Sequence, residues 1–248
     1  MFQVRELVIF KRGIYLTLSF VLLLWGIKSI EWAKDIDLGY FGILPRTLKG
    51  SIGIITGPLI HGDLLHLMSN SFPLLILGLG LFYFYHKIAL EVFAWIYLAT
   101  GFWVWVIGRE AYHIGASGIV YGLMMFIFWG GVFRKNPRSL AISMIIFFLY
   151  GYMIYGLFPG DENVSWESHL MGSVAGIFLA IYFKKVPIYI GESPPASHYH
   201  DQEDQVFHTV NKVKWDHTYP GNIHLHYDFK KNENEQEPGE TGKPDLSN

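Results

Sequence analysis

Long apolar runs separated by shorter polar segments make up the first 186 residues of the chain. A transmembrane helix needs about 20 mostly apolar residues, and six runs approach that length. Backbone groups without hydrogen bonds are costly in lipid, so each run is predicted to be a helix. The runs lie at about Leu7–Ile30, Leu64–Tyr85, Ile88–Ile107, Ser117–Phe133, Leu140–Phe158 and Ser168–Phe183. The predicted fold is therefore an all-α polytopic membrane protein with a bundle of six transmembrane helices.

The first run has the basic start and apolar centre of a signal peptide. The segment that follows, EWAKDIDLGY, contains no small-x-small cleavage site, and further apolar runs come later in the chain. We therefore interpret the first run as a retained anchor. The next segment, Glu31–Ile60, is too polar in its first half to cross a membrane and is predicted to be a long loop.

The composition changes after Val186. Residues 187–248 contain 11 acidic and 5 basic side chains, whereas residues 1–186 contain 10 and 14. Such a polar segment is typical of solvated, largely disordered chain, and only residues 210–229 are apolar enough to predict a short hairpin. Six of the 11 histidines lie here, and scattered surface histidines are favoured over a metal site. Two parts are predicted: a membrane domain at 1–186 and a polar, acidic tail at 187–248.

Charge and composition narrow the functional classes further. The chain contains no cysteine, which excludes disulfides, thiolate nucleophiles and cysteine metal sites. Basic residues are not patterned with aromatics as in nucleic-acid-binding proteins. They are concentrated in the loops that are cytoplasmic if the N-terminus is cytoplasmic, as the positive-inside rule requires. Both termini are therefore predicted to be cytoplasmic.

Polar side chains inside a membrane are costly and are functional candidates. The first group is HGDLLHLMSN, which places His61, His66 and Asn70 near the start of the second run. His66 and Asn70 are one turn apart and share a helix face. His61 lies off that face or before the helix, so the spacing differs from the His-Glu-x-x-His pattern of zinc proteases, whose glutamate is also missing. The alternative is three interfacial residues wetted by lipid headgroups.

The second group is GASG, residues 115–118, which places Ser117 at the start of the fourth run. Tyr121 follows one turn later on the same helix face. A lone Gly-x-Ser-Gly is weakly specific, because small residues are common wherever membrane helices pack closely. Taken alone, this motif favours a serine that serves helix packing.

The third group is SHLMGSVAG, with His169 at the start of the last run. Gly172 and Gly176 form a Gly-x-x-x-Gly face, which lets two helix backbones approach closely. His169 lies on that face and is predicted to point towards the neighbouring helix. A buried structural histidine is the alternative.

The three groups together contain the parts of a hydrolase: a serine, a histidine that could deprotonate it, and donors for an oxyanion. His66, Ser117 and His169 each lie in the first turns of the second, fourth and sixth runs. These runs begin on the same side of the membrane, the outer side if the N-terminus is cytoplasmic. The three side chains are therefore predicted to lie at similar depth.

In this order and on these helices, the motifs resemble the rhomboid family of intramembrane serine proteases. The resemblance covers about residues 7–185 and rests on His61, His66 and Asn70, on GASG, and on His169 with its two glycines. Many bacterial members carry a Trp-Arg pair in the first loop, and this chain lacks it. The missing pair bears on how the first loop lies in the membrane, and it does not bear on the catalytic chemistry that the other motifs imply.

The resemblance implies a role for each polar residue. Ser117 would be the nucleophile and His169 its general base. The oxyanion would be held by His66 and Asn70 together with the Ser117 backbone N–H. The resemblance also implies that His61 shapes or hydrates the site, and that Tyr121 packs against the catalytic imidazole.

The predicted function is therefore an intramembrane serine endopeptidase that cleaves transmembrane segments of membrane proteins with a Ser–His dyad. No cofactor or metal is expected, and the analogy suggests a bacterial cytoplasmic membrane. No acid is positioned to orient His169, because Asp161, Glu162 and Glu167 are assigned to a loop. Two alternatives stay open: a catalytically inactive rhomboid relative that binds membrane clients, and a histidine-lined ion transporter, which would require acidic residues within the spans.

Overall fold

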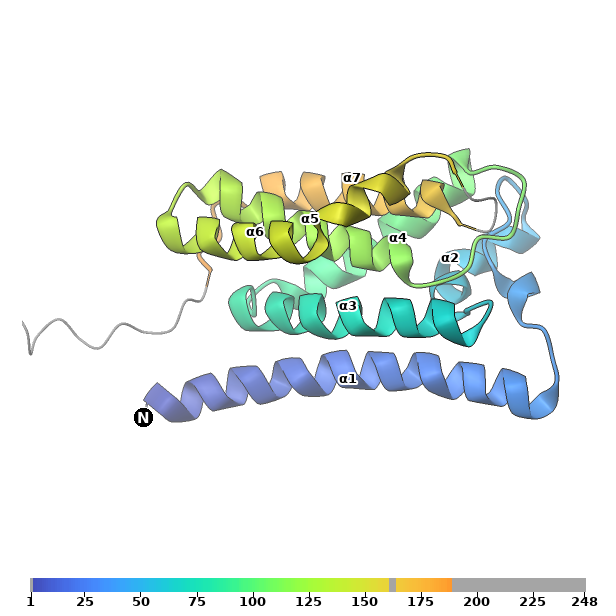
Figure 1. The fold of residues 1–248 in the computed structure, drawn as a ribbon, viewed down its shortest axis with the longest axis horizontal. Helices are drawn as coiled ribbons and strands as arrows, with labels where there is room; N and C mark the ends of the chain where they lie inside the picture. The colour runs from blue at the N-terminus through green and yellow to red at the C-terminus, as the bar shows by residue number, and fades with distance from the viewer. Residues whose placement is uncertain (1, 161–163, 189–248) are drawn as a thin grey trace, which may run out of the picture. The chain divides into compact units, whose positions relative to one another are not determined.

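The computed structural model describes residues 2–160 and 164–188, all within one compact unit, Met1–Gly191. Over these residues the chain is helical, and its long helices lie side by side as a bundle (Figure 1). The α-helices are α1 (Phe2–Lys34), α2 (Gly53–Thr56), α3 (Leu64–Phe84), α4 (Ala89–Ile107), α5 (Ser117–Arg134), α6 (Pro137–Tyr150) and α7 (Trp166–Tyr182). Short 3-10 helices are η1 (Gly39–Phe41), η2 (Lys49–Ile52), η3 (Gly57–Leu59) and η4 (Gly151–Leu157).

Five helical segments are long and apolar enough to cross a membrane: Val8–Lys34, Leu64–Phe84, Ala89–Ile107, Ser117–Arg134 and Pro137–Leu157. The last helix, α7, has 17 residues. At about 1.5 Å per residue it is roughly 25 Å long, less than the roughly 30 Å of a hydrocarbon core. The all-α membrane fold predicted from the sequence is confirmed for the described residues, whereas the sixth span stays a prediction.

The fifth apolar run consists of two kinds of helix. α6 begins at Pro137, with Asn136 as its N-cap, and ends at Tyr150. The chain then tightens into η4, whose seven residues are an unusual length for a 3-10 helix. Two carbonyls of η4, those of Met153 and Gly156, contact polar side chains of α5 and α7. Tertiary contacts therefore hold a segment that the apolar pattern alone could not distinguish from α-helix.

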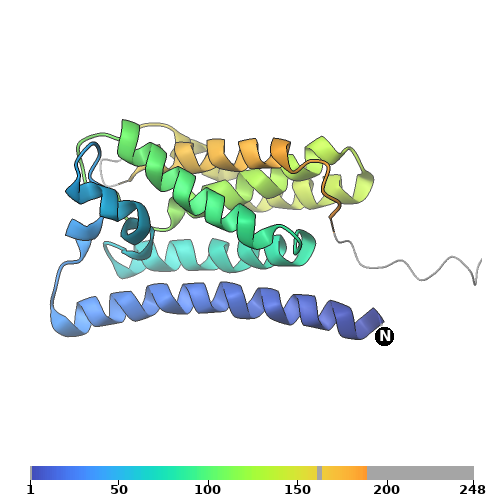
Figure 2. The same ribbon diagram turned by 180° about the vertical axis from the view of Figure 1, so that it is seen from behind.

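α5 is the central helix and packs against α3, α4, α6 and α7 (Figures 1 and 2). Its central side chain, Phe126, is completely buried. α5 approaches α7 so closely that a Cβ atom at Gly172 would overlap the Gly118 carbonyl oxygen, and one at Gly176 would overlap that of Gly122. The Gly-x-x-x-Gly face of α7 therefore meets a second pair of glycines, with the same spacing, on α5.

The loop between α1 and α3 covers the end of the bundle where α3, α5 and α7 begin (Figure 1). Ile43 in this loop forms an isolated antiparallel bridge with His113 in the loop between α4 and α5. Lys28 of α1 donates hydrogen bonds to the carbonyls of His61 and Gly62, each at 2.9 Å. These contacts fix the loop over the helix starts that carry the three polar groups.

The predicted polar tail begins at residue 187, so only its first two residues belong to the described part of the chain. The hairpin predicted at 210–229 lies outside the described residues.

Candidate active site

Ser117 is the first residue of α5, and the backbone before it has a conformation that glycine allows. Gly115 has φ +104°, a region that side chains other than glycine's rarely occupy. A Cβ atom at Gly115 would also lie 2.6 Å from Cε1 of His66. The half-buried Ser117 therefore follows a turn that requires glycine for two independent reasons. Within the described residues the Ser117 N–H makes no hydrogen bond, as is usual for the first turn of a helix.

His61 positions this turn. Its Nε2 atom accepts a hydrogen bond from the Ala116 N–H at 3.3 Å, one residue before Ser117, and its side chain is only 1% exposed. Burial, helped by the positive charge that the neighbouring His66 can carry, lowers the pKa of His61 to about 4. His61 is therefore neutral at pH 7, as an accepting Nε2 requires.

His66 and Asn70 lie one turn apart at the start of α3. Asp63 caps this helix, and its Oδ1 accepts from the His66 N–H at 2.7 Å. The His66 ring lies against Gly115, and its centroid is 5.1 Å from that of the His61 ring. The Asn70 amide is buried and donates to the His66 carbonyl at 3.0 Å. The first turn of α3 thus brings His66 to the turn before Ser117, and Asn70 lies one turn further along α3.

His169 lies in the first turns of α7 and is 8% exposed. Its ring stacks on that of Tyr121, with centroids 4.1 Å apart and an interplanar angle of 7°. Its Nδ1 lies 2.9 Å from the Gly156 carbonyl oxygen. Because a carbonyl can only accept, Nδ1 carries the hydrogen, and Nε2 of the neutral ring keeps a free lone pair.

The contact between α5 and α7 brings the residues next to Ser117 and His169 together. Gly118, which follows Ser117, lies against the carbonyl of Ser168, which precedes His169: a Cβ atom at Gly118 would be 3.0 Å from that oxygen. Among the described residues no hydrogen bond joins the Ser117 hydroxyl to His169. Catalytic hydrogen bonds are often long without substrate and shorten when substrate binds.

The position of Glu167, two residues before His169, differs from the sequence expectation. Glu167 was expected in a loop, but it lies in the first turn of α7 and is 4% exposed. Its carboxylate lies 3.6 Å from the Arg109 guanidinium, which offsets the cost of burying the charge. The hydrogen-bond partner of the His169 ring is the Gly156 carbonyl and not this acid. The sequence analysis did not select His113, whose ring lies against Ser165 at the start of α7. A lone histidine before GASG forms no recognisable motif.

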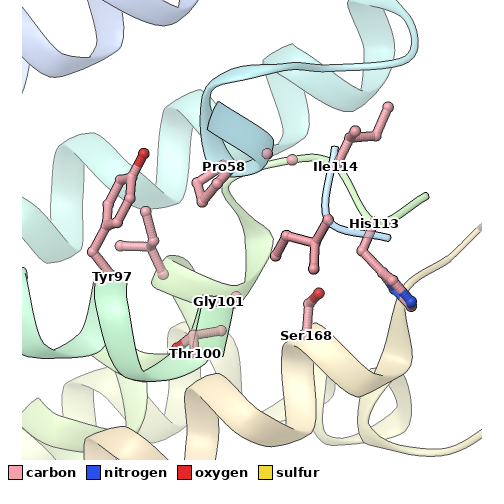
Figure 3. Close-up of a pocket in the computed structure, with 12 residues that line it drawn as sticks. Pro58, Tyr97, Thr100, Gly101, His113, Ile114 and Ser168 are labelled. Carbon is pink, nitrogen blue, oxygen red and sulfur yellow. The ribbon is translucent and has the colours of Figure 1, made fainter. Parts of the chain in front are cut away.

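A small cavity adjoins the start of α5 (Figure 3). Tyr97, Thr100 and Gly101 of α4 line it on one side, and His113 and Ser168 on the other. The space that the centre of a water molecule can occupy inside it is about 10 Å³, which is enough for one water. The Thr100 hydroxyl is buried here without a hydrogen-bond partner in the described part of the chain. Ser117 and His169 lie outside its lining.

Comparison with known proteins gives a family match and several relatives. A family model described as the Rhomboid domain matches residues 49–186. Proteins of Mycobacterium tuberculosis and Mycobacterium bovis, each described as uncharacterized, are 34% identical over 183 residues, which cover 68% of this chain and 74% of theirs. An uncharacterized protein of Mycobacterium leprae is 30% identical over 185 residues, covering 68% of this chain and 70% of its own.

Proposed function

Because this chain belongs to the rhomboid family, we propose that it is an intramembrane serine endopeptidase with Ser117 as nucleophile and His169 as general base. The observation that carries the proposal is the α5–α7 contact, where the residue after Ser117 meets the residue before His169. Both side chains lie in helices that begin at the same end of the bundle (Figure 1).

The hydrogen bond from His169 Nδ1 to the Gly156 carbonyl supports the assignment of the base. A serine hydroxyl is a weak nucleophile until an adjacent base removes its proton. With Nδ1 protonated, the lone pair on Nε2 takes the proton from Ser117 Oγ as this oxygen attacks the scissile carbonyl. The imidazolium then donates this proton to the leaving amine, and water hydrolyses the acyl-enzyme.

A backbone carbonyl suits this position better than a carboxylate would. An ionised acid without a close partner is costly to bury, and Glu167, the acid two residues before His169, is already paired with Arg109. The Gly156 carbonyl holds the ring in one tautomer without adding a permanent charge. The proposal is therefore a Ser–His dyad oriented by main chain, with Tyr121 stacked on one face of the ring.

The oxyanion would form at the start of α5. The N–H of Ser117 makes no hydrogen bond within the described chain, and the positive end of the helix dipole favours negative charge there. His66 lies against Gly115, two residues earlier, and Asn70 is the next polar side chain on that face of α3. Each donor that contacts an oxyanion contributes on the order of 10²–10³ in rate.

The substrates would be transmembrane segments of other membrane proteins. An intact helix engages its peptide carbonyls in its own hydrogen bonds, so a substrate has to unwind locally before Ser117 can attack. Glycine and proline disfavour helix, so we expect them near the cleaved bond. The chain is an integral membrane protein; a bacterial cytoplasmic membrane, with both termini cytoplasmic and the site near the outer face, is part of the proposal.

The test uses the full-length protein in liposomes with a fluorophosphonate probe and a single-span substrate that has small residues near its outer end. Wild type should be labelled and should cleave, whereas Ser117→Ala should do neither. Ser19→Ala is the matched control, because Ser19 is an exposed serine on α1 and its loss should leave both signals unchanged. A folded wild type that is neither labelled nor active would overturn the proposal in favour of client binding.

A further inference from the structure

A chain of hydrogen bonds connects the loop that precedes Ser117 with the start of the helix that carries His169. We propose that His113 is a positioning residue for the dyad, and that its hydrogen bond to Ser165 sets the separation of Ser117 and His169. This inference rests on the proposed function. The bond between His113 Nδ1 and Ser165 Oγ, 2.6 Å long, is called the loop–cap bond below.

Ser165 is the N-cap of α7. Its hydroxyl accepts from the Ser168 N–H at 3.3 Å and lies 2.7 Å from the Ser168 hydroxyl. Its carbonyl accepts from the His169 N–H at 3.3 Å. The first turn of α7, and with it the backbone of His169, is therefore organised around Ser165.

His113 is held firmly on the other side of the loop–cap bond. It is 2% exposed, and its backbone exchanges two hydrogen bonds of 2.9 Å with Ile43. Its Nε2 lies 3.1 Å from the Arg109 carbonyl, which can only accept, so Nε2 carries the hydrogen. Nδ1 of the neutral ring then accepts from the Ser165 hydroxyl, and the Ser168 hydroxyl can donate to Ser165.

The protonation state of His113 agrees with this direction of bonding. Burial lowers the pKa of His113, which favours the neutral ring. Two charged groups face it, and they act in opposite directions: Glu167 raises the pKa and Arg109 lowers it. The loop–cap bond therefore has a neutral acceptor at pH 7.

The loop–cap bond lies close in the chain to both residues of the proposed dyad. Ser117 lies four residues after His113, and His169 lies four residues after Ser165. Both four-residue segments are themselves held by hydrogen bonds. The first is held by the bond from the Ala116 N–H to His61, and the second by the bond from the His169 N–H to the Ser165 carbonyl. A shift at the loop–cap bond is therefore transmitted to the gap between nucleophile and base. Figure 3 shows His113 and Ser168 on the same side of the small cavity, from the loop and from α7.

A second connection runs parallel to the loop–cap bond. Arg109, in the same loop, forms the ion pair with Glu167 and donates from Nη2 to the Val164 carbonyl at 3.0 Å. This connection would keep the loop on α7 if the loop–cap bond were removed. Loss of the loop–cap bond should therefore change the alignment of the dyad more than the stability of the fold.

The test removes the bond from each side in the full-length protein in liposomes. Ser165→Gly deletes the hydroxyl and keeps a residue that N-caps tolerate well. His113→Leu deletes the acceptor, and His113→Asn restores an acceptor oxygen near the place of Nδ1. We expect kcat and the rate of fluorophosphonate labelling to fall about tenfold or more in the first two variants, with KM unchanged, and to recover at least partly in His113→Asn. The double variant should lose no more than either single one.

Asn136→Gly is the matched control, because it changes the N-cap of α6 in the same way, far from the dyad in sequence and without a contact to it. Its labelling rate should stay that of wild type. Thermal unfolding of each variant separates misfolding from misalignment. If Ser165→Gly and His113→Leu are folded and label as fast as wild type, the inference fails while the proposed function stands. If the folded wild type is not labelled by the fluorophosphonate, the proposed function itself is wrong.

Discussion

The imidazole of His169 and the phenol ring of Tyr121 lie parallel, with centroids 4.1 Å apart and 7° between their planes. The Tyr121 hydroxyl donates to the Met153 carbonyl at 2.8 Å, and His169 Nδ1 bonds the carbonyl of Gly156, three residues further along η4. The two stacked rings, one from α5 and one from α7, are therefore both attached to the same short 3-10 helix.

Replacement of Tyr121 should separate stacking from hydrogen bonding. Tyr121→Phe keeps the ring and loses the bond to the Met153 carbonyl, so kcat/KM should fall only a few-fold. Tyr121→Leu also loses the flat surface that orients the imidazole, and its kcat/KM should fall by about tenfold more. Steady-state cleavage by both variants checks this order. Equal losses would show that the stacked ring does not orient His169.

A methyl group at Gly156 should disturb the base directly. A Cβ atom there would overlap the Tyr121 hydroxyl and lie 3.2 Å from His169 Nδ1. Gly156→Ala should therefore lower kcat by about 10² or more, because small displacements of catalytic groups cost that much. Gly160→Ala is the control, since a Cβ atom at Gly160 has nothing within 4 Å. Comparable activity of the two variants would contradict orientation of His169 by η4.

The glycine contact between α5 and α7 should govern stability. Gly172→Ala places a Cβ atom onto the Gly118 carbonyl oxygen, so the two backbones have to separate. We expect a loss of about 1–3 kcal/mol in the free energy of unfolding, the usual cost of overpacking. Gly26→Ala on α1 meets nothing within 4 Å and should not destabilise. Thermal unfolding in detergent distinguishes them, and identical midpoints would argue against close packing as the role of Gly172.

The fold should become less stable in acid through His61. Its pKa falls from 6.5 to about 4 on folding, so the unfolded chain binds more protons between these values. The stability that His61 contributes is therefore complete above about pH 6.5 and is lost as the pH falls towards 4. His61→Gln offers an uncharged acceptor for the Ala116 N–H and does not titrate in this range. Its unfolding free energy should vary less with pH over this interval than that of wild type, and an unchanged slope would refute the prediction.

The sequence by itself determined the helices and their chemistry. Lipid cannot hydrogen-bond a backbone, so the lengths of the apolar runs predicted where helices lie. Polar side chains are costly there, so HGDLLHLMSN, GASG and SHLMGSVAG marked the starts of α3, α5 and α7. These three motifs also carried the resemblance to the rhomboid family, which the family match at residues 49–186 confirms.

Only the tertiary structure decided how these side chains are held. The partner that orients His169 is the Gly156 carbonyl, and every residue except proline carries the same backbone groups, so no motif could have predicted it. His61 bonds the Ala116 N–H 55 positions along the chain, and His113 bonds Ser165 across 52. Such contacts depend on how close two helices approach, which Gly118 and Gly172 permit but which no local pattern specifies. Local sequence thus sets which groups are available, and packing between distant helices sets which of them meet.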